Sequence, residues 1–230
     1  MASLSTALSK SVNQLADRAI LKVLLKTILI TLAIFALLGG ALWFGLDHLL
    51  GEQGFAFSAE LGAIVALLVA IAGGWLLFRI VALAVLQFFA DEIVQAVEAK
   101  HYPELLGAAR KLPFPEELAN SARGAGRALL ANGIAAILAI PLLFTAIGPA
   151  IVFWAVNAWL LGRELQDMVW LRHRGSPADP PPLSGPTRFL LGGAVAALLI
   201  VPFLNLLAPI IGAASATHLV HGRRGSHNAA

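Results

Sequence analysis

The six histidines of this sequence could act as metal ligands or as acids and bases, but their spacing does not indicate a site. They are His48, His101, His173, His218, His221 and His227. His218 and His221 lie three residues apart, but no third ligand follows at a spacing typical of zinc, and the pair lies near the end of the chain. No serine-hydrolase elbow, phosphate loop or paired catalytic carboxylates occur. The sequence therefore predicts no enzyme, no catalytic residue, no bound metal and no cofactor.

A polar cluster follows the long apolar stretch that contains Asn157. Arg163 and Asp167 are four residues apart, so they can pair on one helix face, with Glu164 beside them. An arginine here is able to attract an anion at the mouth of a membrane pathway. The alternative is that Arg163 only anchors a helix end at the membrane surface.

Three further polar residues lie inside apolar runs. Arg79 is a functional candidate, because a charge within a membrane is costly. The alternative is that its side chain extends to the membrane surface. Asn157 and Asn205 either line a path through the membrane or form hydrogen bonds that join helices.

The composition indicates an all-α integral membrane protein. Of 230 residues, 59% are hydrophobic and 13% are charged, compared with about 25% charged residues in soluble domains. The net charge of +3 does not indicate nucleic-acid binding, because Lys and Arg flank apolar segments and form no polar face. Cysteine is absent, which excludes disulfides and thiolate chemistry.

The pattern predicts one membrane domain, residues 1–230, with two long transmembrane helices and two re-entrant helical hairpins. Its parts are an amphipathic interfacial helix (1–17), two long membrane helices (18–100), a cytoplasmic polar segment (101–127), hairpin 1 (128–174), a proline-rich linker (175–187), hairpin 2 (188–222) and a tail (223–230).

The hairpins are inferred from length and proline positions. Only 35 residues separate Arg127 from Arg163, and 34 separate Arg188 from Arg223. Two full crossings and a turn need more than about 40 residues. Prolines flank each apolar bend, which predicts turns inside the membrane at Pro141, Pro149, Pro202 and Pro209. The alternative is two long, proline-kinked single helices.

Charge distribution favours the hairpins. Of 16 Lys and Arg residues, all but Arg79 lie outside the apolar runs, and none lies between Asp47 and Glu60. The positive-inside rule places that turn outside and the other polar segments in the cytoplasm. Re-entrant hairpins return to the same side, as this distribution requires.

Two segments resemble the CysZ-like sulfate permeases, the etoposide-induced-protein-like family. They run from Pro149 through Asn157-Ala-Trp-Leu-Leu-Gly-Arg-Glu to His173, and from Val201-Pro-Phe-Leu-Asn through Thr217 to His218. The resemblance implies a multi-pass protein of the bacterial inner membrane with two long helices and two hemi-penetrating hairpins. It also implies a basic motif at the start of the first helix, where Arg18 matches, and places Thr217 among the pathway residues.

The resulting hypothesis is an anion permease or channel, passive or proton-linked, that admits sulfate for cysteine biosynthesis. Its expected partners are sulfate or a related small anion, membrane lipid and further copies of itself, and no nucleic acid. The alternative is a membrane-organising or regulatory protein that transports nothing.

Overall fold

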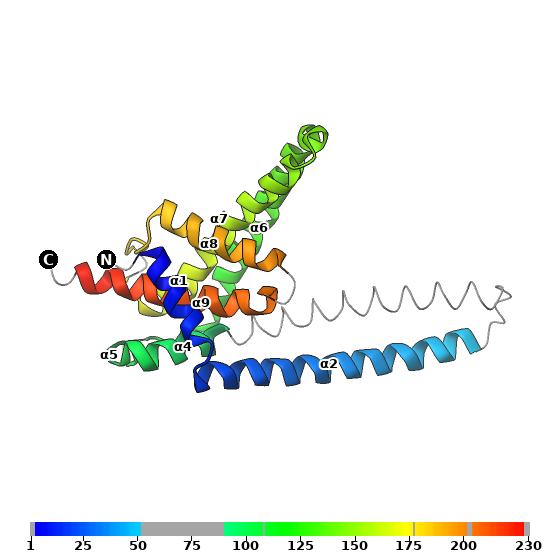
Figure 1. Cartoon of the computed structure of the whole chain (residues 1–230), viewed down its shortest axis with the longest axis horizontal. Helices are drawn as coiled ribbons and strands as arrows, with labels where there is room; N and C mark the ends of the chain where they lie inside the picture. Colours follow the sequence, from blue (N-terminus) through cyan, green and yellow to red (C-terminus); the bar gives the residue numbers. More distant parts are fainter. Residues whose placement is uncertain (1–2, 52–89, 108, 177, 202–203, 228–230) are drawn as a thin grey trace. The chain divides into compact units, whose positions relative to one another are not determined.

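The computed structural model describes residues 3–51, 90–107, 109–176, 178–201 and 204–227, and every regular element in those ranges is helical (Figure 1). The elements are α1 (Leu4–Gln14), α2 (Arg18–Gly51), α4 (Ala90–His101), α5 (Pro103–Leu106), α6 (Phe114–Leu142), the short 3-10 helix η1 (Leu143–Thr145), α7 (Gly148–His173), α8 (Gly185–Ile200) and α9 (Leu204–His227). The candidate residues Arg79 and Pro202 lie outside these ranges. The fold is therefore all-α over the described residues, as predicted.

The chain forms two compact units, residues 21–89 and residues 1–20 with 90–230. Most of α2 belongs to the first unit, and Arg18–Ala41 is long and apolar enough to cross a membrane. The second candidate span is Phe114–Thr145, in the other unit. The second of the two long helices predicted within 18–100 lies outside the described residues.

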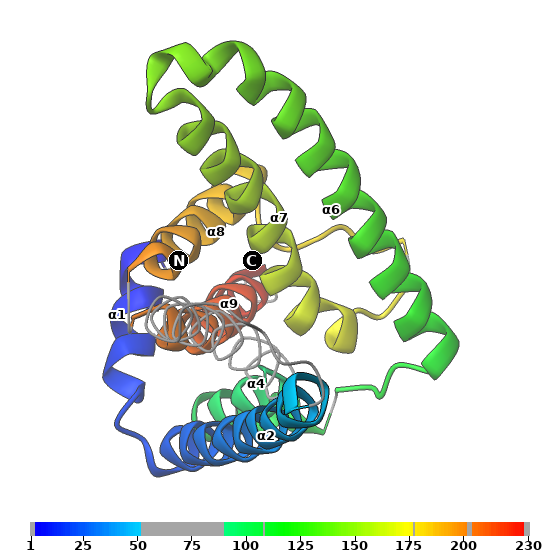
Figure 2. The ribbon, with the colours of Figure 1, turned by 90° about the vertical axis from the view of Figure 1, so that its right-hand side faces the viewer.

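Helices α6 and α7 form a helical hairpin (Figure 2). Pro141 lies one residue before the end of α6, and Pro149 is the second residue of α7, where a missing N–H costs no helical hydrogen bond. Thr145 caps the turn, since its hydroxyl donates to Leu142 O at 2.7 Å and accepts from Gly148 N at 3.0 Å. The predicted bend between Pro141 and Pro149 is confirmed as a turn, and its position inside a membrane stays a prediction.

Helix α6 begins within the segment predicted to be polar and continues past Arg127, so the first arm of this hairpin starts at Phe114. Prolines 113 and 115 flank that start. Acidic side chains at positions 116 and 117 occupy the first turn, where their negative charge is stabilised by the positive end of the helix dipole. The arm is therefore longer than the apolar run alone indicates.

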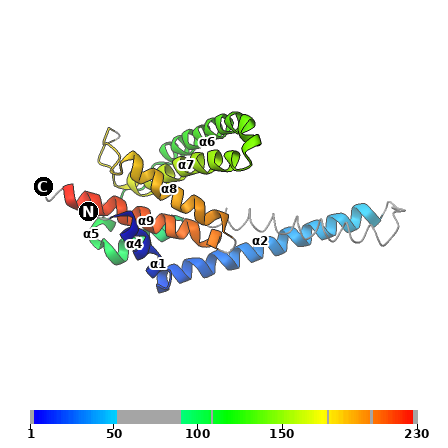
Figure 3. The ribbon, with the colours of Figure 1, turned by 45° about the horizontal axis from the view of Figure 1, so that its top comes forward.

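The second pair of helices, α8 and α9, also pack on each other (Figure 3). The prediction that Pro209 lies in their turn is wrong, because α9 begins at Leu204 and contains Pro209. Pro209 is the sixth residue of α9, so the carbonyl of Asn205 lacks the N–H donor that position 209 would otherwise supply.

Helices α7 and α8 approach so closely that two glycines are required. A Cβ on Gly162 would collide with the backbone carbonyl of Arg188, and one on Gly192 would collide with the backbone at Ala158 and Gly162. Trp154 adds a hydrogen bond across the same contact, from its indole N–H to Gly193 O at 3.2 Å. Small residues thus fix α8 directly against α7.

Helices α1 and α4 pack on α9. The buried face of α1 consists of Ala7, Ser11 and Gln14, and Ser215 of α9 donates a hydrogen bond to Ser11 Oγ at 2.9 Å. Val12, on the apolar stripe beside this buried face, is half exposed. The predicted interfacial position of residues 1–17 remains a prediction.

Candidate functional sites: an arginine-lined cavity and a buried histidine cluster

A cavity of about 740 Å³ lies among α6, the C-terminal half of α7, the segment after α7 and the start of α8. This volume is in the usual range for small-molecule sites. Six arginines line the cavity: Arg123, Arg127, Arg163, Arg172, Arg174 and Arg188. Five carboxylates also line it: Asp91, Glu117, Glu164, Asp167 and Asp179. The lining is therefore rich in charge of both signs, with a small excess of cations.

Part of this charge is neutralised inside the protein. Arg163 pairs with Asp167 at 3.6 Å, which confirms the predicted pairing of these two residues. Arg174 pairs with Glu116 at 2.6 Å, and Arg110 pairs with the same carboxylate at 2.7 Å. These two arginines hold the start of α6 against the end of α7.

Arg172 also lines the cavity, and no ion pair of its side chain is found among the described residues. Its Nη1 atom is buried and has no hydrogen-bond partner among the described residues. The helix holds the residue in place, because Arg172 is in the last turn of α7 and its carbonyl accepts a hydrogen bond from Arg110 N at 2.9 Å. A buried guanidinium donor without a partner is costly. The residue is also part of the cavity wall, where its positive charge favours an anion.

The proline-rich segment after α7 closes one side of the cavity. Asp179 Oδ2 accepts hydrogen bonds from Gly175 N at 2.9 Å and Ser176 N at 2.8 Å, which folds the segment into a turn. Leu183 is buried, and its N–H donates to the buried Gln166 Oε1 at 3.3 Å. The linker is thus attached to α7 and contributes to the cavity wall.

The structure brings together three of the predicted site residues and separates the others. Arg163, Glu164 and Asp167 all line the large cavity. Arg18 lies elsewhere, in a cavity of about 170 Å³ whose lining includes Lys100. Its neighbour there, Asp17, pairs with Lys100 at 2.7 Å, so the local positive charge near Arg18 is partly neutralised.

Asn157, Asn205 and Thr217 line neither cavity. Asn157 is exposed, and its amide donates to Phe153 O of its own helix at 2.8 Å. Thr217 is buried, and its hydroxyl donates to Ala213 O at 2.8 Å. Asn205 lies in the first turn of α9, and Arg79 is outside the described residues. In this structure the side chains of Asn157 and Thr217 each form a hydrogen bond within their own helix.

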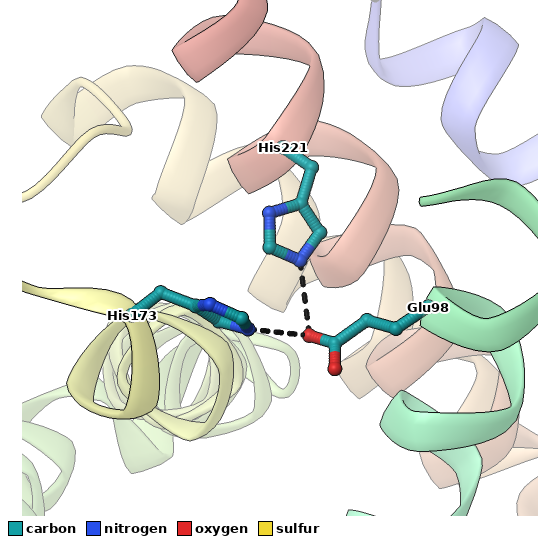
Figure 4. Close-up of side chains that lie close together, drawn as sticks. All are labelled: Glu98, His173 and His221. Atoms are coloured by element: carbon teal, nitrogen blue, oxygen red, sulfur yellow. Dashed lines mark hydrogen bonds and ion pairs between the residues drawn. The ribbon is translucent and has the colours of Figure 1, made fainter. Parts of the chain in front are cut away.

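A second polar site, which the sequence analysis missed, lies where α4, α7 and α9 meet. Glu98 accepts hydrogen bonds from His173 Nε2 at 2.8 Å and His221 Nε2 at 3.0 Å, and all three side chains are fully buried (Figure 4). Beside this triad, His218 lies within hydrogen-bond distance of Gln14 and of the Tyr102 hydroxyl, each at 3.0 Å. His218 and His221 therefore do not belong to a loose tail, and Glu98 is not a solvent-exposed acid.

The histidines determine the charge of Glu98. Burial alone raises the pKa of this carboxyl, but hydrogen bonds from His173 and His221 outweigh burial and lower the pKa to about 2. Glu98 is therefore ionised at neutral pH even though its side chain is excluded from solvent.

His218 should make the stability of the protein depend on pH. Burial, and then the nearby His101, Lys10 and His221, lower its pKa from 6.5 to about 4. Between these values the unfolded chain binds more protons than the folded one, so stability falls as pH decreases from about 6.5 to 4, by up to about 3 kcal/mol. Thermal unfolding at a series of pH values should show this slope in the wild type and a smaller slope in His218→Asn. Equal slopes would contradict the prediction.

Comparison with known proteins identifies the family. The model of the family described as "Sulfate transporter CysZ/Etoposide-induced protein 2.4" matches residues 7–209. No curated protein and no solved structure matches this chain. The match covers most of the chain, including the first of the two segments on which the resemblance was based, the second segment as far as residue 209, and all the residues that line the large cavity. The chain therefore belongs to the sulfate transporter CysZ/etoposide-induced protein 2.4 family.

Proposed function

We propose that this protein is an anion permease or channel of the bacterial inner membrane, that it takes up sulfate, and that this uptake supplies cysteine biosynthesis. The proposal is one of transport and not of catalysis. The observation that carries it is the arginine-lined cavity, with Arg172 in its wall, in a member of a sulfate transporter family.

The chemistry of the cavity suits a doubly charged oxyanion that must be released again. Guanidinium groups donate paired hydrogen bonds to the oxygens of such an anion. The five carboxylates in the same lining repel it and limit its affinity. A transport site requires this balance, because an anion that binds too tightly does not leave.

The α6–α7 hairpin supports the membrane part of the proposal. Its distal surface is apolar and exposed, with Leu129, Ile137 and Leu143 each more than 60% exposed and Phe144 at 96%. Water is an unfavourable environment for so large an apolar surface, and lipid is a favourable one. We propose that both hairpins enter the membrane from the cytoplasmic side and return to it.

A labelling experiment distinguishes a re-entrant hairpin from a full crossing, and the chain contains no cysteine that would interfere. A cysteine at Phe144 should be protected from membrane-impermeant thiol reagents added on either side. A cysteine at Ser176, which is exposed, should react from the cytoplasmic side only. Reaction of the Phe144 cysteine from the outside would show that the hairpin crosses the membrane.

The turn of a re-entrant hairpin exposes backbone groups at membrane depth, and such groups need protein or a water-filled cavity around them. We propose that further copies of the chain provide this environment, so that the transporter is a homo-oligomer. Mass measurement of the purified protein in lipid nanodiscs tests this point, and a monomer that still transports sulfate would contradict it.

Equilibrium binding tests the substrate. The purified full-length protein in detergent should bind radiolabelled sulfate saturably, and unlabelled sulfate should compete for it more strongly than chloride. Raising the ionic strength should weaken binding, because much of the attraction is electrostatic. Protein that is folded but binds no sulfate above the background of empty detergent micelles would contradict the assignment of sulfate.

A further inference from the structure

The Glu98–His173–His221 triad has the chemical features of a metal centre. The side chains come from three different helices, α4, α7 and α9, and converge on one point in the interior (Figure 4). One ligand atom from each residue lies within 4.8 Å of the other two. We infer that these three residues form a binding site for a divalent transition-metal ion of the zinc type.

The distances fit such an ion after a small adjustment. Zinc lies about 2.0–2.2 Å from imidazole nitrogen and carboxylate oxygen, so neighbouring ligand atoms in a tetrahedral site are about 3.3 Å apart. The two nitrogen-to-oxygen distances here are 2.8 Å and 3.0 Å. Side-chain movements of about half an ångström would make room for the ion, with no change of helix position.

The donor atoms also favour a metal over hydrogen bonds alone. Glu98 Oε2 is buried and has no hydrogen-bond partner among the described residues. An ion bound by both carboxylate oxygens and both Nε2 atoms would have four protein ligands. Each imidazole would then carry its hydrogen on Nδ1 and coordinate through the Nε2 lone pair.

The ligand set selects the class of ion. Two imidazoles and one carboxylate suit zinc and its transition-metal neighbours, whereas magnesium and calcium prefer oxygen ligands throughout. The buried, closed position indicates a structural ion and not a catalytic one. By joining residues 98, 173 and 221, the ion would fix the end of α7, and therefore the neighbouring Arg172, relative to α4 and α9.

Metal content and metal-dependent stability test the site. Tag-free, full-length protein in detergent is stripped with a chelator and titrated with zinc chloride. We expect about one zinc ion per chain and a higher unfolding temperature after zinc is added. Cobalt in place of zinc should give the intense visible absorption of a four-coordinate ion. Wild-type protein that binds no zinc or cobalt, and whose stability does not respond to either, would overturn the inference.

Matched variants locate the ion. His221→Gln should weaken zinc binding by more than the roughly 10- to 100-fold that loss of an outer-shell partner costs. His218→Gln, one turn earlier on α9 and also buried, should keep the stoichiometry. Equal loss in both variants would contradict the assignment to this triad. If His221→Gln does not fold, His173→Gln takes its place, with the same expected loss of zinc binding and the same His218→Gln control.

This inference is independent of sulfate transport. Zinc binding is measured on protein without sulfate, and sulfate binding can be measured with and without bound zinc. A protein that binds sulfate but no zinc would overturn the metal site alone, and the opposite result would overturn the transport proposal alone.

Discussion

Gly192→Ala should destabilise the protein by about 2–3 kcal/mol, the range expected when a side chain is forced into a packed contact. The added methyl group would collide with the backbone of α7 at Ala158 and Gly162, and backbone atoms cannot move aside as a flexible side chain can. The two helices would have to separate, which would also displace Arg188 from its contact with Gly162. Thermal unfolding in detergent should show a clearly lower midpoint.

The matched control is the same substitution at Gly133, in the interior of α6. A Cβ there meets no atom within 4 Å. Alanine is the better helix former, so Gly133→Ala should leave stability unchanged or raise it by about 0.5–1 kcal/mol. If Gly192→Ala is as stable as the wild type, α7 and α8 are not in backbone contact at this point.

Arg172→Gln should have the largest effect on sulfate binding, about 10- to 100-fold weaker than the wild type. A hydrogen bond from a charged donor is worth about 1.5–3 kcal/mol, and tenfold in affinity corresponds to about 1.4 kcal/mol. The substitution removes a cavity cation whose Nη1 is buried and has no hydrogen-bond partner in the part of the chain that the structure describes, so little internal bonding is lost with it. Radiolabelled sulfate binding measures the change directly.

Two controls make this result specific. Lys111→Gln removes an exposed cation that lies outside the cavity lining, so sulfate affinity should change by less than about twofold. Arg18→Gln tests the smaller cavity, because the family resemblance places Arg18 in a basic motif and Arg18 lines that cavity. If Arg18→Gln abolishes binding and Arg172→Gln does not, the anion site belongs to the smaller cavity and the present assignment is wrong.

Much of the fold could be predicted because it depends on local patterns. Apolar runs and proline positions predicted helices and the turn between Pro141 and Pro149, and the structure has a turn there. The pairing of Arg163 with Asp167 followed from helix periodicity alone. Pro209 was expected in a turn because it and Pro202 flank an apolar bend, but α9 begins at Leu204 and includes it.

The buried polar sites could not be predicted in the same way, because they join residues distant in sequence. Glu98 and His221 are 123 positions apart and meet only when α4 packs on α9. A weaker signal was present, since Glu98 lies on the same helix face as the apolar Val94 and Val97, where a charged residue needs a buried partner. The partner itself could not be identified from one sequence.

The large cavity shows the same limit. Arg163, Glu164 and Asp167 were recognised because they cluster in the sequence, but Arg123 and Arg188 come from other helices. Each had been interpreted only as part of the one-sided distribution of positive charge. Because α6 and α8 both pack on α7, arginines that resemble membrane-surface anchors in the sequence lie together in the wall of one cavity.

Sulfate flux through reconstituted protein tests the central claim most directly. Proteoliposomes that contain the wild type should accumulate radiolabelled sulfate down an imposed gradient, faster than protein-free liposomes. Uptake by Arg172→Gln should be reduced at least tenfold, and uptake by Lys111→Gln should equal that of the wild type. Folded wild-type protein that passes neither sulfate nor other small anions above the protein-free background would contradict the account and favour a non-transporting, membrane-organising role.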